Sequence, residues 1–157
     1  MRNTTLCYIE KDGCYLMLHR VKKKNDVNKD KWIGIGGGFE EDESPEDCIR
    51  REALEETGLT LGELKLRAVI TFIIENGVCE HMFLFKTSDF CGELIECSEG
   101  VLEWVPKDRL YSLDLWEGDI IFLNKLEEES VFFTLKLVYS EDGKLISAIE
   151  NGSNVIK

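Results

Sequence analysis

Three glutamates lie close together in residues 45–59, which read PEDCIRREALEETGL. In a helix, residues three and four apart share a face, so Glu52, Glu55 and Glu56 fall on one stripe among apolar side chains. A core face would not hold three acids, because burying unpaired carboxylates is costly. Carboxylate oxygens are the ligands that Mg²⁺ prefers, and Mg²⁺ keeps positions free for substrate phosphates. The stripe indicates metal-assisted phosphate chemistry, and an ordinary acidic, solvated helix is the alternative.

Glycines at positions 34, 36, 37 and 38 lie just before this segment. Glycine lets the backbone approach a ligand closely and presents carbonyls and amides to a metal or a phosphate. Glycine runs alone usually mark turns, but this run leads into the acidic segment within a few residues. We therefore expect its backbone to belong to the same site.

Residues typical of helix ends lie before and after the three glutamates. Ser44 is a typical N-cap, Pro45 fits the first helical position, and acids occupy the first turn. Gly58 is a natural stop. The sequence therefore predicts a helix over residues 45–57 that holds the glutamates in place.

Strand and turn signals fill most of the remaining chain. Strands are expected over residues 4–9, 14–19, 64–74, 79–86, 103–105, 131–140 and 144–149, with turns at 11–13, 76–77 and 142–143. A second helix is expected over residues 115–126, and a polar, basic loop over 21–31. Strands before, between and after two helices predict an α/β fold, with a mixed sheet and helices on its faces.

Length and charge limit the class of partner. The 157 residues fit a single domain, 1–157. The formal charge of -12 repels polyanions, so we expect no nucleic acid and no membrane as a partner. A small anionic substrate fits only where a bound cation inverts the local field. The basic stretch at 21–24 either steers phosphates to such a site or is a solvated loop.

The cysteines and the N-terminal segment indicate the compartment. The segment MRNTTLCYIEKDG lacks the pattern of a signal peptide, and no apolar run approaches the length of a membrane span. None of the six cysteines forms a CxxC pair, and neither histidine lies near a cysteine pair. We therefore expect no zinc site, reduced and packed thiols, and a cytoplasmic protein.

The segment 37–59 resembles the signature of the Nudix hydrolases. That signature is G, five residues, E, seven residues and then REUxEExGU, where U is aliphatic. This chain has Gly37, Glu43 and, at 51–59, REALEETGL, with both spacers of the same length. The resemblance implies an α/β/α sandwich with a central mixed β-sheet, and cleavage of a diphosphate linkage in a nucleotide-like substrate.

The resemblance also implies roles for single residues of this segment. The implied ligands of Mg²⁺, or of Mn²⁺ in its place, are Glu52, Glu55, Glu56 and the backbone carbonyl of Gly36. Arg51 would orient one of these glutamates, and Glu43 would tie the preceding loop to the helix. Gly37 and Gly58 would support the motif.

The family also implies a general base, which is either a helix glutamate or an acid of a later loop. Glu99 stands just before the expected strand 103–105 and is the candidate in that loop. A surface role is the alternative for Glu99, and Glu96 is the weaker candidate.

A second resemblance covers most of the chain. It rests on KWIG at 31–34, GELIE at 92–96, Trp104 and LWEGD at 115–119, which look like segments of the oxidised-purine nucleoside triphosphatases, the MutT-like 8-oxo-dGTP diphosphatases. It implies that Trp116 stacks on the base and that Asp119 reads the purine edge. A core tryptophan is the alternative for Trp116. Phe72 either lines the same pocket or, as its place on a strand favours, packs in the core.

Two positions depart from the vertebrate members of that group. Ile33 stands where they have an asparagine, and Gly118-Asp119 stands where they have two aspartates. Bacterial relatives often have an aliphatic residue at the first place, so purine binding remains expected and selectivity for 8-oxo-purines is left open.

The leading hypothesis is therefore hydrolysis of a purine nucleoside triphosphate, oxidised or not, to the monophosphate and pyrophosphate. One alternative keeps this chemistry for ADP-ribose, a nucleotide sugar or a dinucleotide polyphosphate. Another is a non-catalytic, ligand-sensing module, but such modules usually lack some motif acids, and this chain has them all. We expect a monomer or a homodimer that acts on a small-molecule nucleotide.

Overall fold

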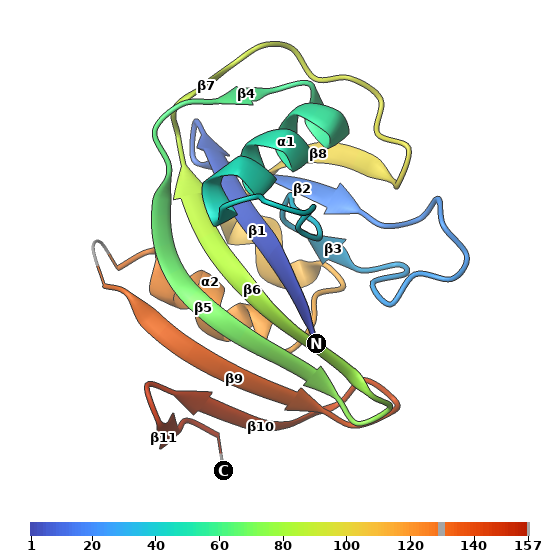
Figure 1. Ribbon diagram of the computed structural model, residues 1–157, viewed down its shortest axis with the longest axis vertical. Helices are drawn as coiled ribbons and strands as arrows, with labels where there is room; N and C mark the ends of the chain where they lie inside the picture. Colours follow the sequence, from blue (N-terminus) through green and yellow to red (C-terminus); the bar gives the residue numbers. More distant parts are fainter. Residues whose placement is uncertain (129–130, 157) are drawn as a thin grey trace.

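A large mixed β-sheet forms the centre of the fold (Figure 1). The computed structural model describes residues 1–128 and 131–156. Its elements are β1 (Arg2–Lys11), β2 (Cys14–His19), β3 (Trp32–Ile33), α1 (Pro45–Thr57), β4 (Thr60–Leu61), β5 (Lys65–Ile74), β6 (Val78–Thr87), β7 (Phe90–Cys91), β8 (Val101–Pro106), the 3₁₀ helix η1 (Lys107–Ser112), α2 (Asp119–Leu126), β9 (Phe133–Tyr139), β10 (Leu145–Glu150) and β11 (Ser153–Asn154). The nine-stranded sheet has the order β11-β10-β9-β5-β6-β1-β2-β3, with β8 paired to β2, and β4 and β7 form a separate pair.

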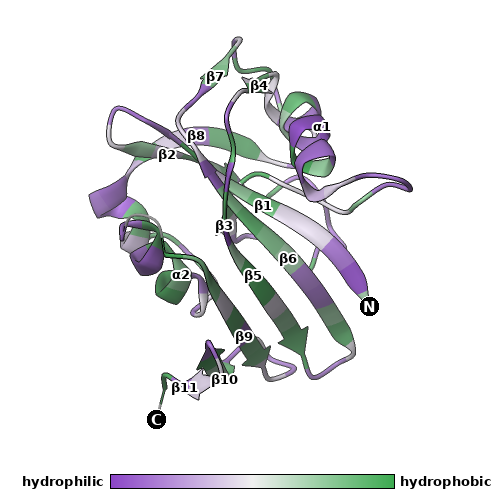
Figure 2. Cartoon of the chain, turned by 60° about the vertical axis from the view of Figure 1, so that its left-hand side comes forward, coloured by the Kyte–Doolittle hydropathy of each residue, from purple (hydrophilic) through white to green (hydrophobic). Residues whose placement is uncertain are grey.

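The helices α1 and α2 cover opposite faces of this sheet (Figures 1 and 2). Strand β1 is buried on both faces, and its successive side chains point to opposite sides, so they enter two different core clusters. Leu6 and Tyr8 pack in the core cluster that contains α2, whereas Cys7 and Ile9 pack in the cluster that contains α1. This arrangement confirms the predicted α/β/α sandwich with a central mixed sheet.

The sheet splits beside β1, and this split positions the site. One edge of β1 pairs in parallel with β6 along most of its length. Its other edge pairs with β2 only next to the turn. Farther from the turn, residues 34–38 take the place of β2 beside β1, and we call them the glycine segment. Bridges between Cys7 and Ile35 and between Thr4 and Gly38 hold this segment to β1.

Helix α1 begins and ends where the sequence predicts. The Ser44 hydroxyl accepts a hydrogen bond from the Asp47 amide, and the Asp47 carboxylate accepts one from the Ser44 amide, which completes a capping box. Pro45 occupies the first turn. Gly58 ends the helix with a φ of 80°, and its amide donates to the Leu54 carbonyl.

Helix α2 begins at Asp119, so the predicted start at residue 115 is wrong. Tertiary contacts fix the chain just before the helix. The Gly118 amide donates to the Tyr139 hydroxyl at 2.7 Å, and a Cβ on Gly118 would lie 2.6 Å from that oxygen. Trp116 therefore lies in a turn before the helix, with its carbonyl accepting from the Asp119 amide at 3.0 Å.

The other predicted elements are present, with bounds shifted by a few residues. The two-residue strands β3, β4, β7 and β11 and the helix η1 were not predicted, because such short elements carry no periodic pattern. All six cysteines are free thiols, as expected. Over the ranges that the structure describes, none of the helices combines the length and apolar character needed to span a membrane.

Candidate active site

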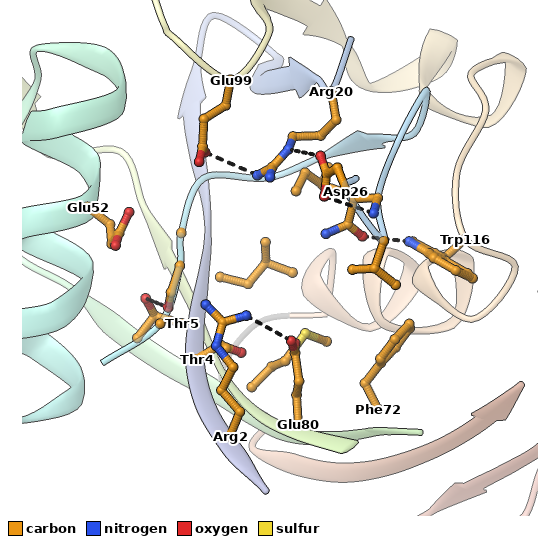
Figure 3. A pocket seen from close by; sticks show the side chains of 18 of the residues that line it. Arg2, Thr4, Thr5, Arg20, Asp26, Glu52, Phe72, Glu80, Glu99 and Trp116 are labelled. Atoms are coloured by element: carbon orange, nitrogen blue, oxygen red, sulfur yellow. Dashed lines mark hydrogen bonds and ion pairs between the residues drawn. The ribbon is translucent and has the colours of Figure 1, made fainter. Parts of the chain in front are cut away.

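One pocket collects most of the predicted site residues (Figure 3). Its walls come from α1, β1, β5, the glycine segment, the loops after β2 and before β8, and the start of α2. Figure 3 shows Glu52 and Glu99 on one side and Phe72 and Trp116 on the other. Asp119 also lines the pocket. Residues far apart in the sequence thus form two chemically different ends of one cavity.

Two glycines are required where the backbone passes between β1 and α1. A Cβ on Gly37 would lie 2.6 Å from the carboxyl carbon of Glu52. A Cβ on Gly36 would lie 1.9 Å from the Thr5 carbonyl oxygen. The Gly36 amide donates to Oε1 of Glu56 at 3.1 Å. A larger residue at position 37 would therefore displace Glu52, and one at position 36 would push the segment away from β1.

Arg51 joins the loop before α1 to the helix itself. Its guanidinium makes a bidentate pair with Glu43, with Nε–Oε2 at 2.7 Å and Nη2–Oε1 at 2.9 Å. Nη2 also donates to the Gly38 carbonyl at 2.9 Å. Nη1 donates to Glu52 at 2.9 Å and to Glu55 at 3.2 Å. These contacts suit the positioning roles predicted for Arg51 and Glu43.

Two carboxyl groups of α1 are largely buried. Glu56 is 6 % exposed, and within the described ranges its Oε2 atom has no hydrogen-bond partner. Burial, reinforced by the carboxyl group of Glu99, raises the pKa of Glu56 to about 9. Burial also raises the pKa of Glu52, although Arg51 opposes this. A buried carboxyl oxygen without a partner matches the ligand that a hard cation requires.

Glu99 reaches the same region from the loop before β8. It accepts from Lys23 Nζ at 2.8 Å and from Arg20 Nη1 at 3.2 Å. Burial alone would raise the pKa of Glu99, but Glu56, Lys23 and Arg20 together hold it below its usual value. Glu56 therefore keeps a proton while Glu99 stays ionised. Glu96, in contrast, has a side chain that is 92 % exposed.

Glu55 differs from the other two motif glutamates. Its side chain is 59 % exposed and pairs with Arg51. In the part of the chain that the structure describes, no three side chains of Asp, Glu, His or Cys form a group that could hold a metal ion. The three glutamates share a helix, but their surroundings differ, since Glu55 is exposed whereas Glu52 and Glu56 are largely enclosed. The candidate metal ligands that face inward present oxygen atoms, which fit Mg²⁺ or Mn²⁺. They are Glu52, Glu56 and the backbone of the glycine segment.

Aromatic side chains form the other end of the pocket. Trp116 is 6 % exposed, and its ring meets Phe72 and Tyr139 edge-on at centroid distances of 5.2 and 4.9 Å. Its Nε1 atom donates to Asn28 at 2.8 Å, and Lys31 Nζ lies 5.2 Å from the ring centroid. Trp116 and Phe72 therefore pack in the core on the α2 side and line the pocket as well.

Asp119 adds an ionisable group to this aromatic end. It is buried in the first turn of α2. Burial raises the pKa of Asp119 to about 8, although the Lys31 ammonium opposes this. At pH 7 the carboxyl group is therefore largely protonated, and it can donate a hydrogen bond as well as accept one.

Sequence reasoning missed seven polar residues of the pocket: Arg2, Thr4, Thr5, Arg20, Asp26, Asn28 and Glu80. Arg20, Asp26 and Asn28 line it from the end of β2 and the loop that follows. The loop was predicted only as polar and basic. No spacing in the sequence marks these residues, because the chain folds back irregularly there and brings together neighbours that no period relates.

The chain is similar to known proteins over most of its length. The model of the NUDIX domain matches residues 2–126. An uncharacterized Nudix hydrolase of Bacillus subtilis, YvcI, is 28% identical over 152 residues, which is 94% of this chain and 92% of that protein. An oxidized purine nucleoside triphosphate hydrolase of Danio rerio is 30% identical over 111 residues, 70% of this chain and 71% of that protein. The crystal structure of a MutT protein from Bacillus halodurans matches with a TM-score of 0.85 at 25% identity, covering 96% of this chain and 98% of the other.

Proposed function

This chain belongs to the Nudix family and is a Nudix pyrophosphohydrolase, and we propose that its substrate is a purine nucleoside triphosphate, cleaved to the monophosphate and pyrophosphate. The observation that carries the proposal is the two-ended pocket. Buried carboxyl groups at one end suit a metal-bound phosphate chain, and aromatic side chains with Asp119 at the other suit a purine base. The relative from Danio rerio, named for oxidized purine nucleoside triphosphates, supports the same substrate class.

The phosphate end would hold a divalent cation. Glu52, Glu56 and the Gly36 carbonyl would be its protein ligands, and Glu55 would join them from the exposed side of the helix. Held there, such a cation would supply positive charge against the charge that develops on the phosphates and would lower the pKa of an attacking water. Arg51 keeps Glu52 in place through its contacts with Glu43 and the Gly38 carbonyl.

Glu99 is our candidate for the general base. It stays ionised beside Lys23 and Arg20, so at neutral pH it can accept a proton from the attacking water. The ion pair with Arg20 also fixes the direction of the carboxylate, because both side chains are mostly enclosed.

The aromatic end would bind the base. Trp116 and Phe72 supply apolar surface, and the neutral Asp119 carboxyl donates to an acceptor on the purine edge. Lys31 Nζ lies over the Trp116 ring, so a base that stacks on that face displaces the ammonium. Ile33 lines the pocket without a polar group, so it cannot form a hydrogen bond with the base, and Asp119 is our candidate for that role.

The test is a substrate panel in Mg²⁺ and in Mn²⁺. It contains dGTP, 8-oxo-dGTP, other nucleoside triphosphates, ADP-ribose, a nucleotide sugar and a diadenosine polyphosphate. Glu56→Gln is expected to lower the rate about a hundredfold or more, because it removes a metal ligand. Glu46→Gln is the matched control, since Glu46 lies on the same helix and is exposed.

The expected result is a clear preference for a purine triphosphate, with pyrophosphate as a product. Preference for ADP-ribose or a nucleotide sugar would replace the proposed substrate and keep the chemistry. Equal rates for the wild-type protein and Glu56→Gln would overturn the proposed metal site.

A further inference from the structure

A continuous set of hydrogen bonds connects the two ends of the pocket (Figure 3). Trp116 Nε1 donates to Asn28 Oδ1 at 2.8 Å, and the backbone N–H of Asn28 donates to Asp26 Oδ1 at 3.0 Å. The other Asp26 oxygen accepts from Arg20 Nε at 2.7 Å, and Arg20 Nη1 reaches Glu99 at 3.2 Å. Asp26 is the centre of this set, because each of its two oxygens serves one direction.

Asp26 and Arg20 are enclosed, which gives their contact a defined geometry. Their side chains are 5 % and 12 % exposed. An ion pair in such surroundings is weakly screened, and removing one partner leaves the other charge uncompensated. The pair therefore differs from the exposed Lys29–Asp30 pair of the same loop, at 3.8 Å, which resembles surface pairs of little energetic weight.

The backbone of the loop holds Asp26 in this position. The Arg20 amide donates to the Lys31 carbonyl at 2.9 Å, and the Asp30 amide donates back to the Arg20 carbonyl at 2.8 Å. The Lys29 amide donates to the Asp26 carbonyl at 3.0 Å. Residues 20–31 thus form a closed loop whose inner side chains point to both ends of the pocket.

We propose that Asp26 is a positioning residue that orients Trp116 through Asn28 and Glu99 through Arg20. The inference rests on the proposed function, in which Trp116 contacts the base and Glu99 serves the hydrolysis. Asp26 lines the pocket, but in this proposal it acts through Asn28 and Arg20. Its removal is therefore expected to affect base affinity and turnover together.

The kinetic test compares Asp26→Ala, Asp26→Asn, Asn28→Ala and the control Lys29→Ala with dGTP as substrate. Asp26→Ala is expected to raise KM and lower kcat, each by about tenfold, the size of one lost hydrogen bond at each end. Asn28→Ala is expected to raise KM alone, because it cuts only the branch to Trp116. Asp26→Asn keeps the shape but can accept only one of the two hydrogen bonds, because its Nδ2 group cannot accept from Arg20 or from the Asn28 backbone amide. Its effect is therefore expected to lie between those of the wild type and Asp26→Ala, and Lys29→Ala is expected to match the wild type.

Inorganic tripolyphosphate has no base, so as a substrate it reports on the link from Asp26 to Glu99 and not on the link to Trp116. With this substrate, Asp26→Ala is expected to lower kcat and leave KM unchanged. A change in kcat alone with dGTP, or no difference between Asp26→Ala and Lys29→Ala, would overturn the inference. Tm values of all variants show whether the fold is retained, and Asp26→Asn keeps the test decisive where Asp26→Ala unfolds.

A substrate-free measurement keeps this test apart from the proposed function. The indole N–H signal of Trp116, assigned with Trp116→Phe, is expected to shift and to exchange faster with solvent in Asp26→Ala. An unchanged signal would refute the link even if the enzyme hydrolyses dGTP. Absence of dGTP hydrolysis by the wild-type protein would refute the proposed substrate, while the indole signal would still report on the link between Asp26 and Trp116.

Discussion

At the scale of single residues, the three motif glutamates have three different surroundings. Glu56 is buried against the Gly36 amide, Glu52 is held by Arg51 at the pocket wall, and Glu55 is exposed. Helical spacing predicts that they share a face. It does not predict which one is desolvated, because that depends on the loop that packs against the helix. The chemistry of the site therefore comes from the helix and the glycine segment together.

Burial of Glu56 predicts a pH dependence of stability in metal-free protein. Its folded-state pKa of about 9 lies above the ordinary value of 4.5, so the folded state keeps a proton that the unfolded state loses. The free energy of unfolding is therefore expected to fall as the pH rises from 4.5 to about 9. The measurement is urea unfolding in EDTA at several pH values, with Glu56→Gln as reference. A constant difference between the two proteins would contradict the protonated Glu56.

Asp119 predicts a pH dependence of substrate binding. Above its pKa of about 8 the carboxyl group loses its proton, so it loses the hydrogen bond that it donates and adds a negative charge near an anionic substrate. KM for dGTP is therefore expected to rise as the pH passes 8. In Asp119→Asn, which always carries a donor, this rise is expected to disappear. Parallel KM profiles for the two proteins would argue against Asp119 as the donor.

The residues of the candidate site could be predicted from the sequence to different extents. Helical spacing alone indicates Glu52, Glu55 and Glu56, whereas Arg51 and Glu43 followed from the resemblance to the Nudix signature. Trp116 and Asp119 followed only from a resemblance, since nothing in their own spacing marks a pocket. Arg20, Asp26 and Asn28 were missed, because their contacts arise where an irregular loop folds back on itself.

At the scale of elements, local signals and tertiary contacts contribute differently to the two helices. The ends of α1 are set by Ser44, Pro45 and Gly58, whose preferences act within a few residues, so both ends were predicted. The start of α2 is set by the contact of Gly118 with Tyr139. That contact joins residues far apart in the chain, and a local pattern could not reveal it.

The close passage of the glycine segment predicts the effect of Gly37→Ala. The added methyl group would lie 2.6 Å from the carboxyl carbon of Glu52, so Glu52 has to leave its place beside Arg51. We expect a loss of activity of about a hundredfold with a smaller change in stability, of roughly 1–3 kcal/mol. Activity assays and thermal unfolding of the same samples test this. Wild-type activity in Gly37→Ala would show that the position of Glu52 is unimportant.

At the scale of the whole molecule, a net charge of -12 surrounds a site that must accept an anion. The acidic surface attracts cations unspecifically, whereas the pocket would bind one specifically. The fold that holds both was well predicted, because buried strands, turns and caps repeat along the chain. The pairing of β1 with the glycine segment was not, because it joins a strand to residues without a strand pattern.

Specific metal binding predicts a gain in stability. At about a hundredfold excess over the dissociation constant, Mg²⁺ or Mn²⁺ is expected to add about 2.7 kcal/mol to the free energy of unfolding, or roughly 5–10 °C in Tm. Glu52→Gln/Glu56→Gln is expected to lose this gain. NaCl at matched ionic strength controls for the acidic surface. An equal rise in Tm for the double variant would assign the effect to the surface instead.

The glycine segment has a second consequence, which concerns self-association. An unpaired strand edge invites a strand from another molecule. Strand β1 has no such edge where it leaves β2, because Ile35 and Gly38 bridge to it there. The backbone that lies against Glu52 and Glu56 therefore also shields the central strand. Loosening it is expected both to displace these carboxyl groups and to expose the edge of β1 to another molecule.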